Sequence, residues 1–255
     1  MQTNNKLIVM GISAALGLVT WLLLIFLASI SDILPLMQRF FELMGGTSSG
    51  YIQFFCYIAF FYGLIEMRRM HSVVKKEFEG FDLNLLPSED QLVLDPSEVA
   101  EVKLAIIDME KRGFNYKVAD FIKKACTQYR NDQSVSETLQ VLDVQIENNK
   151  EELEGNLSMV RYLIGAIMSL GFIGTLLGLS NAIGNAHLAK TDEGMPILTA
   201  FLNVAFDTTL VALILGLVLN FFYHSFIEDI DKFYAKSKTY IVDNLISRIY
   251  VPGNS

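Results

Sequence analysis

Long apolar segments dominate this sequence and restrict what it can fold into. About 20 residues cross the hydrocarbon of a bilayer. Four segments are candidates for such spans: Leu7–Ile30, Tyr51–Ile65, Tyr162–Ala186 and Ile197–Phe226. The first is interpreted as a retained helix, because its apolar run is about twice as long as that of a signal peptide. With 52% hydrophobic residues, the chain is expected to be an all-α integral membrane protein in contact with lipid.

The placement of lysine and arginine predicts the orientation of these spans. The basic residues beside the section between the second and third segments are Arg68, Arg69, Lys75, Lys76 and Arg161. In the two loops on the opposite side, Arg39 and Lys190 are the only arginine or lysine residues. We therefore expect both termini and the middle section, about Met67 to Val160, to lie in the cytoplasm.

Several classes of function are disfavoured by composition. A formal net charge of −8 argues against nucleic-acid binding, which needs a basic surface. Cys56 lies in an apolar segment and Cys126 in a charged one, so no disulfide is expected between them. His71, His187 and His224 are scattered, and the sequence contains no HExxH, CxxC or P-loop motif. We expect no metal site, no catalytic residues and no enzyme.

The chain is predicted to have four parts. A hairpin of the first two spans covers residues 1–66, and a cytoplasmic helical insertion covers 67–160. The third and fourth spans form a core over 161–226, and a cytoplasmic helix follows over 227–255. The helices of the third and fourth spans are expected to be long and to extend into the cytoplasm. Within the insertion, Asp95-Pro96-Ser97-Glu98 predicts the start of a helix that ends near Arg112. A second helix is expected over roughly Lys117–Arg130.

A longer helix is predicted to begin at Ser134, where Ser134 and Glu137 form a capping box. Heptad spacing then relates Val135, Leu139, Leu142, Ile146, Leu153, Val160 and Ile167. A continuous helix to Ala186 would be on the order of 75 Å long. The tail shows a second amphipathic pattern at Ile230, Phe233, Tyr234, Ile241 and Leu245. These faces could pack within one chain or form an oligomeric sheath of long helices, and the two arrangements are compatible.

Two stripes of small or weakly polar residues mark the third and fourth spans. The first contains Gly171, Gly174, Thr175, Gly178 and Ala182. The second contains Ala205, Thr209, Ala212, Gly216 and Asn220. Small residues let membrane helices approach closely, so a plain helix–helix contact is one interpretation. The other is a surface facing a narrow pore or a tightly held foreign helix, which several copies in a ring would enclose.

Asp207 is a carboxylate inside the fourth span, where it costs several kcal/mol, and is therefore treated as functional. At 100° per residue it points about 160° away from Thr209, on the side of Asn203 and Ala200. Asp207 could accept protons or line a water-filled approach to a pore. Alternatively, it is protonated or paired and holds a contact between subunits.

The motifs GFIGTLLGL and AFDTTLVALILGL resemble the paired motifs of the MotA/TolQ/ExbB proton-channel family. The resemblance implies a stator or energiser subunit of the bacterial inner membrane that couples proton or sodium flow to mechanical work. Apart from the transported ion, no cofactor is expected. It also implies a homopentamer around a dimer of a single-span MotB/TolR/ExbD-like partner, whose aspartate carries the ion. Four spans with a long insertion look more like MotA than like the three-span TolQ and ExbB.

The resemblance also assigns residues. Thr175 corresponds to the threonine of the family's GxxGT motif and Thr209 to the threonine that opens the pore face of the last span, while Asp207 and Thr208 have weaker counterparts. Many members have proline where this chain has Met168. The driven machine, whether for motility, outer-membrane energisation, gliding or phage defence, is left open. A membrane scaffold and an autonomous ion channel are the alternative functions.

Overall fold

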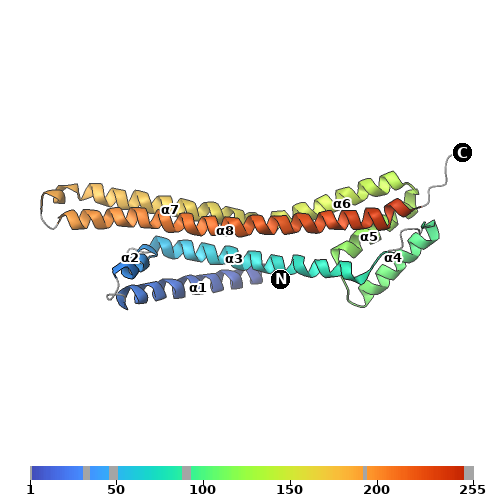
Figure 1. Cartoon of the computed structure of the whole chain (residues 1–255), viewed down its shortest axis with the longest axis horizontal. Coiled ribbons are helices and arrows are strands. Elements are labelled where there is room, and N and C mark those ends of the chain that lie inside the picture. Colours follow the sequence, from blue (N-terminus) through green and yellow to red (C-terminus); the bar gives the residue numbers. More distant parts are fainter. Residues whose placement is uncertain (1, 31–34, 46–50, 88–92, 192–193, 250–255) are drawn as a thin grey trace. The chain divides into compact units, whose positions relative to one another are not determined.

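The structure is a computed structural model that describes residues 2–30, 35–45, 51–87, 93–191 and 194–249. In these ranges the regular structure is helical apart from a β-bridge between Leu94 and Ile249, which confirms the all-α expectation (Figure 1). The α-helices are α1 (Gln2–Ile30), α2 (Pro35–Leu43), α3 (Tyr51–Phe78), α4 (Pro96–Lys111), α5 (Lys117–Asp132), α6 (Val135–Asn156), α7 (Ser158–Gly184) and α8 (Gly194–Asn244). Short 3₁₀ turns are η2 (Glu79–Leu83), η3 (Ala186–Lys190) and η4 (Ile246–Arg248).

Three helical stretches in the described part of the chain are long and apolar enough to cross a membrane. They are Leu7–Ile30, Val135–Gly184 and Gly194–Arg248. The predicted second span, Tyr51–Ile65, is helical within α3 but is not among them. Its apolar run is short and leads directly into the charged residues Glu66 and Arg68. The four-span topology therefore stays a prediction.

The helices fall into two compact units. The first contains α1, α2, α3 up to Arg69, α7, and α8 up to His224. The second contains the rest of α3, then α4, α5 and α6, and α8 from Ser225 onward. The core of each unit is thus built from segments that are far apart in the sequence.

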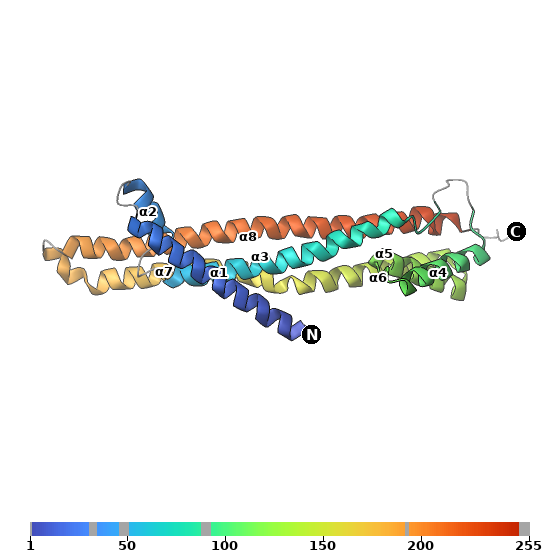
Figure 2. The ribbon, with the colours of Figure 1, turned by 90° about the horizontal axis from the view of Figure 1, so that it is seen from below.

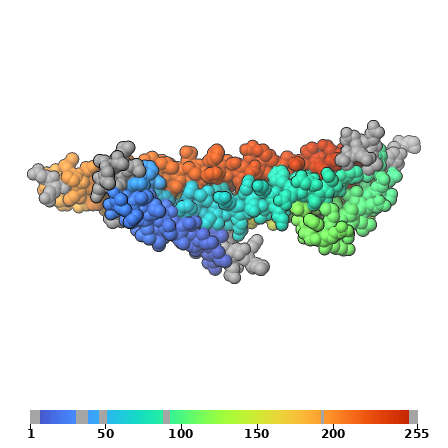
Figure 3. Space-filling model, turned by 60° about the horizontal axis from the view of Figure 1, so that its bottom comes forward, coloured from blue at the N-terminus to red at the C-terminus, as the bar shows by residue number. Residues whose placement is uncertain are grey.

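In the first unit, α7 and α8 run side by side, as Figures 1 and 2 both show. Helix α1 crosses α3 at Gly17, where an added Cβ would lie 2.8 Å from Cγ1 of Ile58. Nearby, the rings of Trp21 and Phe54 lie 5.4 Å apart. The space-filling view shows α1, α3 and α8 presenting one continuous surface in this unit (Figure 3). Close approach at small residues therefore organises this unit.

The second unit has a core of aromatic and aliphatic side chains. The rings of Phe78 and Phe81 lie 5.3 and 5.9 Å from the ring of Phe233. Phe121 and Phe233 are almost fully buried, and the ammonium of Lys236 lies 4.4 Å from the centre of the Phe81 ring. The predicted tail residues, including Phe233, are buried here, so the amphipathic pattern marks a core-facing side of α8.

The two predicted helices of the insertion are confirmed. Helix α4 begins at Pro96, and the backbone N–H of Asp95 donates to Oε2 of Glu98 at 2.8 Å, as a capping box requires. After Lys111 the chain turns at Gly113, whose φ of +95° suits glycine. Helix α5 then begins at Lys117.

One expected helix is interrupted. The helix predicted from Ser134 to Ala186 has a single turn residue, Leu157, between α6 and α7, and α7 ends at Gly184. Gly155 and Asn156, both weak helix formers, directly precede this break. The tail is helical as expected, and it continues the fourth span, because α8 runs without interruption over 51 residues. The sequence from Phe226 to Asn244 contains no glycine or proline that would interrupt it.

Both cysteines are buried free thiols. Cys56 in α3 is 0% exposed and Cys126 in α5 is 1% exposed. Burial raises the pKa of the Cys126 thiol to about 12, because the thiolate is poorly solvated there.

The aromatic core of the second unit predicts the effect of truncating Phe233. We expect Phe233→Ala to destabilise the protein by about 3–5 kcal/mol, because a buried ring is removed and a cavity remains. Phe114→Ala is the matched control, since Phe114 is 46% exposed. Thermal unfolding of the detergent-solubilised protein, followed by circular dichroism, measures both. Equal shifts for the two variants would contradict this description of the core.

Candidate functional site

The glycine stripe of α7 is covered by α8 of the same chain. A Cβ built at Gly171 would lie 2.5 Å from Cβ of Ala212, and one at Gly178 would lie 2.6 Å from Cβ of Ala205. Real Cβ atoms do not approach so closely, so the two helices are as near as their backbones allow. The plain helix–helix contact is therefore realised within one chain.

Gly174 lies at the middle of this contact, against the side chain of Thr208. A Cβ at Gly174 would overlap the Thr208 hydroxyl and lie 2.5 Å from its Cβ. The Thr208 hydroxyl donates within α8, with the carbonyl of Val204 at 2.9 Å and that of Ala205 at 3.1 Å. Thr208 is fully buried, so in this chain it acts as a polar knob seated on Gly174.

Thr175 and Thr209 meet across the same interface through their hydroxyl groups, and we call this pair the threonine cluster. The Thr209 hydroxyl also lies 2.9 Å from the carbonyl of Gly171, and the Thr175 hydroxyl 3.1 Å from the carbonyl of Ala205. Both threonines are half-buried. Four neutral oxygens thus gather at one level of the helix pair. All four can accept hydrogen bonds and the two hydroxyls can also donate them, but none takes up a proton at neutral pH.

Gly216 and Asn220, the remaining members of the second stripe, have different surroundings. A Cβ at Gly216 would lie 3.2 Å from Cγ of Met168, so Gly216 continues the α7–α8 contact. Asn220 instead lines an apolar hollow of about 620 Å³ beside Phe221 and His224. Asn220 is therefore not part of the threonine cluster.

Asp207 forms an ion pair with Arg39, which the distribution of basic residues placed in a loop between spans. Its Oδ1 accepts a hydrogen bond from Nη2 of Arg39 on α2 at 2.8 Å. One signal could have found this partner: an intramembrane acid usually pairs, and Arg39 lies in a short amphipathic helix.

The structure thus gathers most of the predicted residues at one interface: Gly171, Gly174, Gly178, Thr175, Thr208, Thr209, Ala212 and Gly216. Asp207 and Asn220 lie outside it. The roles of all these residues in an ion path stay predictions.

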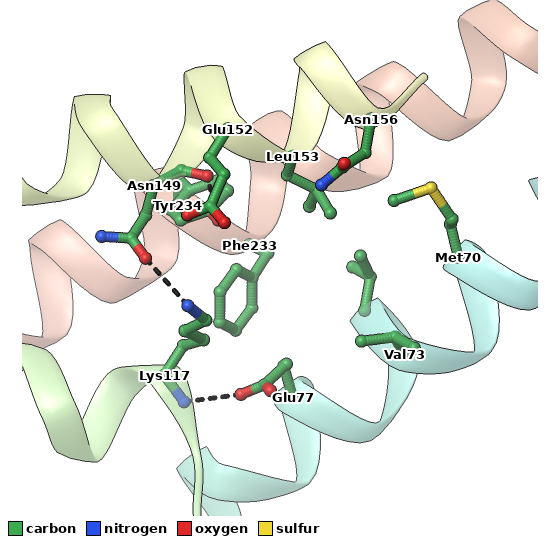
Figure 4. A pocket seen from close by; sticks show the side chains of 11 residues that line it. Met70, Val73, Glu77, Lys117, Asn149, Glu152, Leu153, Asn156, Phe233 and Tyr234 are labelled. Carbon is green, nitrogen blue, oxygen red and sulfur yellow. Dashed lines mark hydrogen bonds between the residues drawn. The ribbon is translucent and has the colours of Figure 1, made fainter. Parts of the chain in front are cut away.

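A second feature is a cavity of about 250 Å³ in the other unit. Figure 4 shows the side chains of Met70, Val73, Leu153 and Phe233 around it, with polar groups at its rim. These side chains come from α3, α6 and α8, and the beginning of α5 completes the lining.

The polar rim of this cavity holds the beginning of α5 in place. The backbone N–H of Lys117 donates to Oε2 of Glu77 at 2.6 Å, and its ammonium donates to Oδ1 of Asn149 at 2.9 Å (Figure 4). Burial raises the pKa of the Glu77 carboxyl, although its bond to the Lys117 N–H acts in the opposite direction. These contacts fasten helices together and assemble no catalytic group. Among the described residues, no cluster of three or more His, Cys, Asp or Glu side chains is placed to hold a metal.

The helices that carry the threonine cluster also carry a family signature. Residues 115–238 match the model of the MotA/TolQ/ExbB proton channel family. The matched segment includes α5, α6, α7 and α8 as far as residue 238, so the resemblance seen in the two motifs is confirmed. Together with the apolar helices, the match indicates a membrane protein that is similar over this segment to a family of proton channels. No curated protein and no solved structure matches the chain.

The contact at Gly174 predicts opposite effects for two glycine substitutions in α7. Alanine usually stabilises a helix relative to glycine by about 1 kcal/mol. At Gly165, where an added Cβ meets open space, we expect Gly165→Ala to be neutral or slightly stabilising. At Gly174 the methyl group would collide with Thr208, so Gly174→Ala should destabilise by about 1–3 kcal/mol. Thermal unfolding in detergent measures the difference, and the same sign for both variants would refute the packing.

Proposed function

We propose that the chain is the channel-wall subunit of an ion-driven stator or energiser. In this proposal, five copies form a ring around a dimer of a single-span MotB/TolR/ExbD-like partner, and proton or sodium flow along the ring is converted into mechanical work. The family match over residues 115–238 carries the proposal. The matched segment contains both helices of the threonine cluster.

The side chains of α7 and α8 suit the wall of a channel better than a group that carries the ion. Between Tyr162 and Gly184, and between Gly194 and Phe226, the sequence contains a single carboxylate, Asp207. A unit charge that crosses a membrane potential releases about 2.3 kcal/mol per 100 mV. Harvesting this energy requires an ionisable group that moves past a fixed surface. In the proposal the partner helix supplies that group, and the neutral threonine oxygens belong to the surface.

The same proposal includes the location and orientation of the complex. The chain lies in the bacterial inner membrane with both termini in the cytoplasm, as the distribution of basic residues predicts. The outer domain of the partner determines which work is done. A peptidoglycan-binding domain would make the complex an anchored stator, whereas a small TolR-like domain would indicate work on the outer membrane.

A membrane scaffold is the second candidate, and one observation favours it. Gly171, Gly174 and Gly178 are all in close contact with α8 of the same chain, so helix packing alone accounts for these glycines. The two functions differ in what they require of the threonine hydroxyls. A scaffold depends chiefly on their volume, which valine reproduces at the loss of one modest interhelical hydrogen bond, whereas an ion path depends on the hydroxyls themselves.

The double variant Thr175→Val/Thr209→Val separates these functions. If the hydroxyls line the ion path, their loss removes hydrogen-bonding groups worth about 1–3 kcal/mol, and ion flow should fall roughly tenfold or more. Flow is measured with a pH-sensitive or sodium-sensitive dye in membrane vesicles from cells that produce the chain with the product of its neighbouring partner gene. Thr199→Val is the matched control, because the exposed Thr199 hydroxyl bonds only within its own helix, to the carbonyl of Met195.

Unchanged flow in the double variant would favour the scaffold. Native mass spectrometry of the purified complex supplies an independent check, with five copies of this chain expected for each pair of partner chains. A monomeric chain would contradict the proposal. Ion flow in vesicles that contain this chain alone would identify an autonomous channel instead.

A further inference from the structure

The ion pair between Arg39 and Asp207 is unusual in its setting. Asp207 belongs to the apolar span of α8, and its side chain is only 11% exposed, whereas that of Arg39 is 45% exposed. The guanidinium Nη2 lies 2.8 Å from Oδ1 of Asp207, while the nearest distance from Arg39 to Glu42 is 3.9 Å. The principal partner of Arg39 is therefore the buried carboxylate.

Arg39 is presented to Asp207 by a helix that is itself held in place. The indole N–H of Trp21 on α1 donates to the carbonyl of Gly45 at 2.9 Å. The hydroxyl of Tyr57 on α3 donates to the carbonyl of Met44 at 2.6 Å. Both carbonyls lie in the turn that ends α2, where a helix leaves acceptors without intrahelical partners. Polar contacts thus tie α2 and its terminal turn to α1, α3 and α8.

Asp207 also directly precedes the residue that seats α8 on α7. Thr208 lies against Gly174, and Thr209 meets Thr175 one position later. The ion pair with Arg39 therefore holds the same turn of α8 that carries Thr209. A carboxylate left alone at this depth would be strongly unfavourable, because few dipoles replace its water.

We propose that Arg39 is a positioning residue that neutralises Asp207 and clips α2 to α8, so that Asp207 is a fixed structural charge and does not carry the transported ion. The statement about ion transport rests on the proposed function. The pairing itself does not, since it follows from the contacts within one chain. The interpretation of Asp207 as a proton acceptor and the interpretation as a paired side chain are thereby distinguished, and the partner is Arg39 of the same chain.

A double-mutant cycle tests the pair. Removing Arg39 leaves the buried Asp207 carboxylate uncompensated, removing Asp207 leaves a half-exposed guanidinium that water can solvate, and replacing both with neutral groups leaves no uncompensated charge. We expect Arg39→Gln to lower the melting temperature in detergent by roughly 5–10 °C, and Asp207→Asn to lower it by less. The double variant Arg39→Gln/Asp207→Asn should lose far less than the sum of the two shifts. Shifts that simply add would overturn the pairing.

The matched control is an ion pair on the surface of α4. Arg112 and Asp108 are in contact, with side chains 70% and 56% exposed, and exposed pairs contribute little. The cycle of Arg112→Gln and Asp108→Asn should therefore show almost no coupling. Coupling as large as that between Arg39 and Asp207 would contradict the role given to the burial of the Asp207 carboxylate.

Ion flow in vesicles from cells that also produce the partner gene's product separates a positioning residue from an ion carrier. A positioning role predicts that each single variant reduces flow at least roughly tenfold and that the neutral double variant recovers most of it. An ion-carrying Asp207 predicts that the double variant stays as inactive as Asp207→Asn, and this result would overturn the proposal. Wild-type vesicles without any flow would refute the proposed function and the statement about transport, while the melting cycle would still test the pair.

Discussion

The contact on which the first unit depends is the close approach of α7 and α8. Lipid tails are as apolar as leucine, so two helices in a bilayer gain little from burying apolar side chains against each other. They gain from dense van der Waals packing and from hydrogen bonds across the interface. Gly174 beneath Thr208 supplies the first and the hydroxyls of Thr175 and Thr209 supply the second. The same residues that bring the helices together thus place neutral oxygens between them.

The charged side chains lie beside the contact between α7 and α8 and not within it. Asp207 follows the helical register of α8 to the side away from Thr209, where α2 provides Arg39. The interface between α7 and α8 therefore stays uncharged, while the only acid of the two core spans is compensated by a neighbouring element. This separation agrees with a wall that offers hydrogen bonds to a passing ion without binding it tightly.

Local patterns in the sequence predicted much of this arrangement. The Asp95-Pro96 start of α4 and the period of the tail residues in α8 both follow from interactions within a few positions. Helical spacing also placed Gly171, Gly174 and Gly178 on one face. Spacing could not say which surface covers that face, because a period of 3.6 residues is the same for a pore, a neighbouring subunit or α8.

Other features depend on contacts that no local pattern encodes. Arg39 and Asp207 are 168 positions apart, and nothing near either residue indicates the other. The break at Leu157 was missed because leucine is a good helix former, while the weak formers Gly155 and Asn156 were judged tolerable. Tertiary packing thus decides the pairing, whereas the interruption follows a local preference whose effect was underestimated.

The burial of both native thiols has a practical consequence. Thiolates react with maleimides and related reagents far faster than buried, protonated thiols do. Cys56 and Cys126 are each almost completely enclosed, so a new cysteine placed on an exposed helix face would be labelled selectively in the wild-type background. Spectroscopic reporters can therefore be attached to this protein without first replacing its own cysteines and disturbing the cores around them.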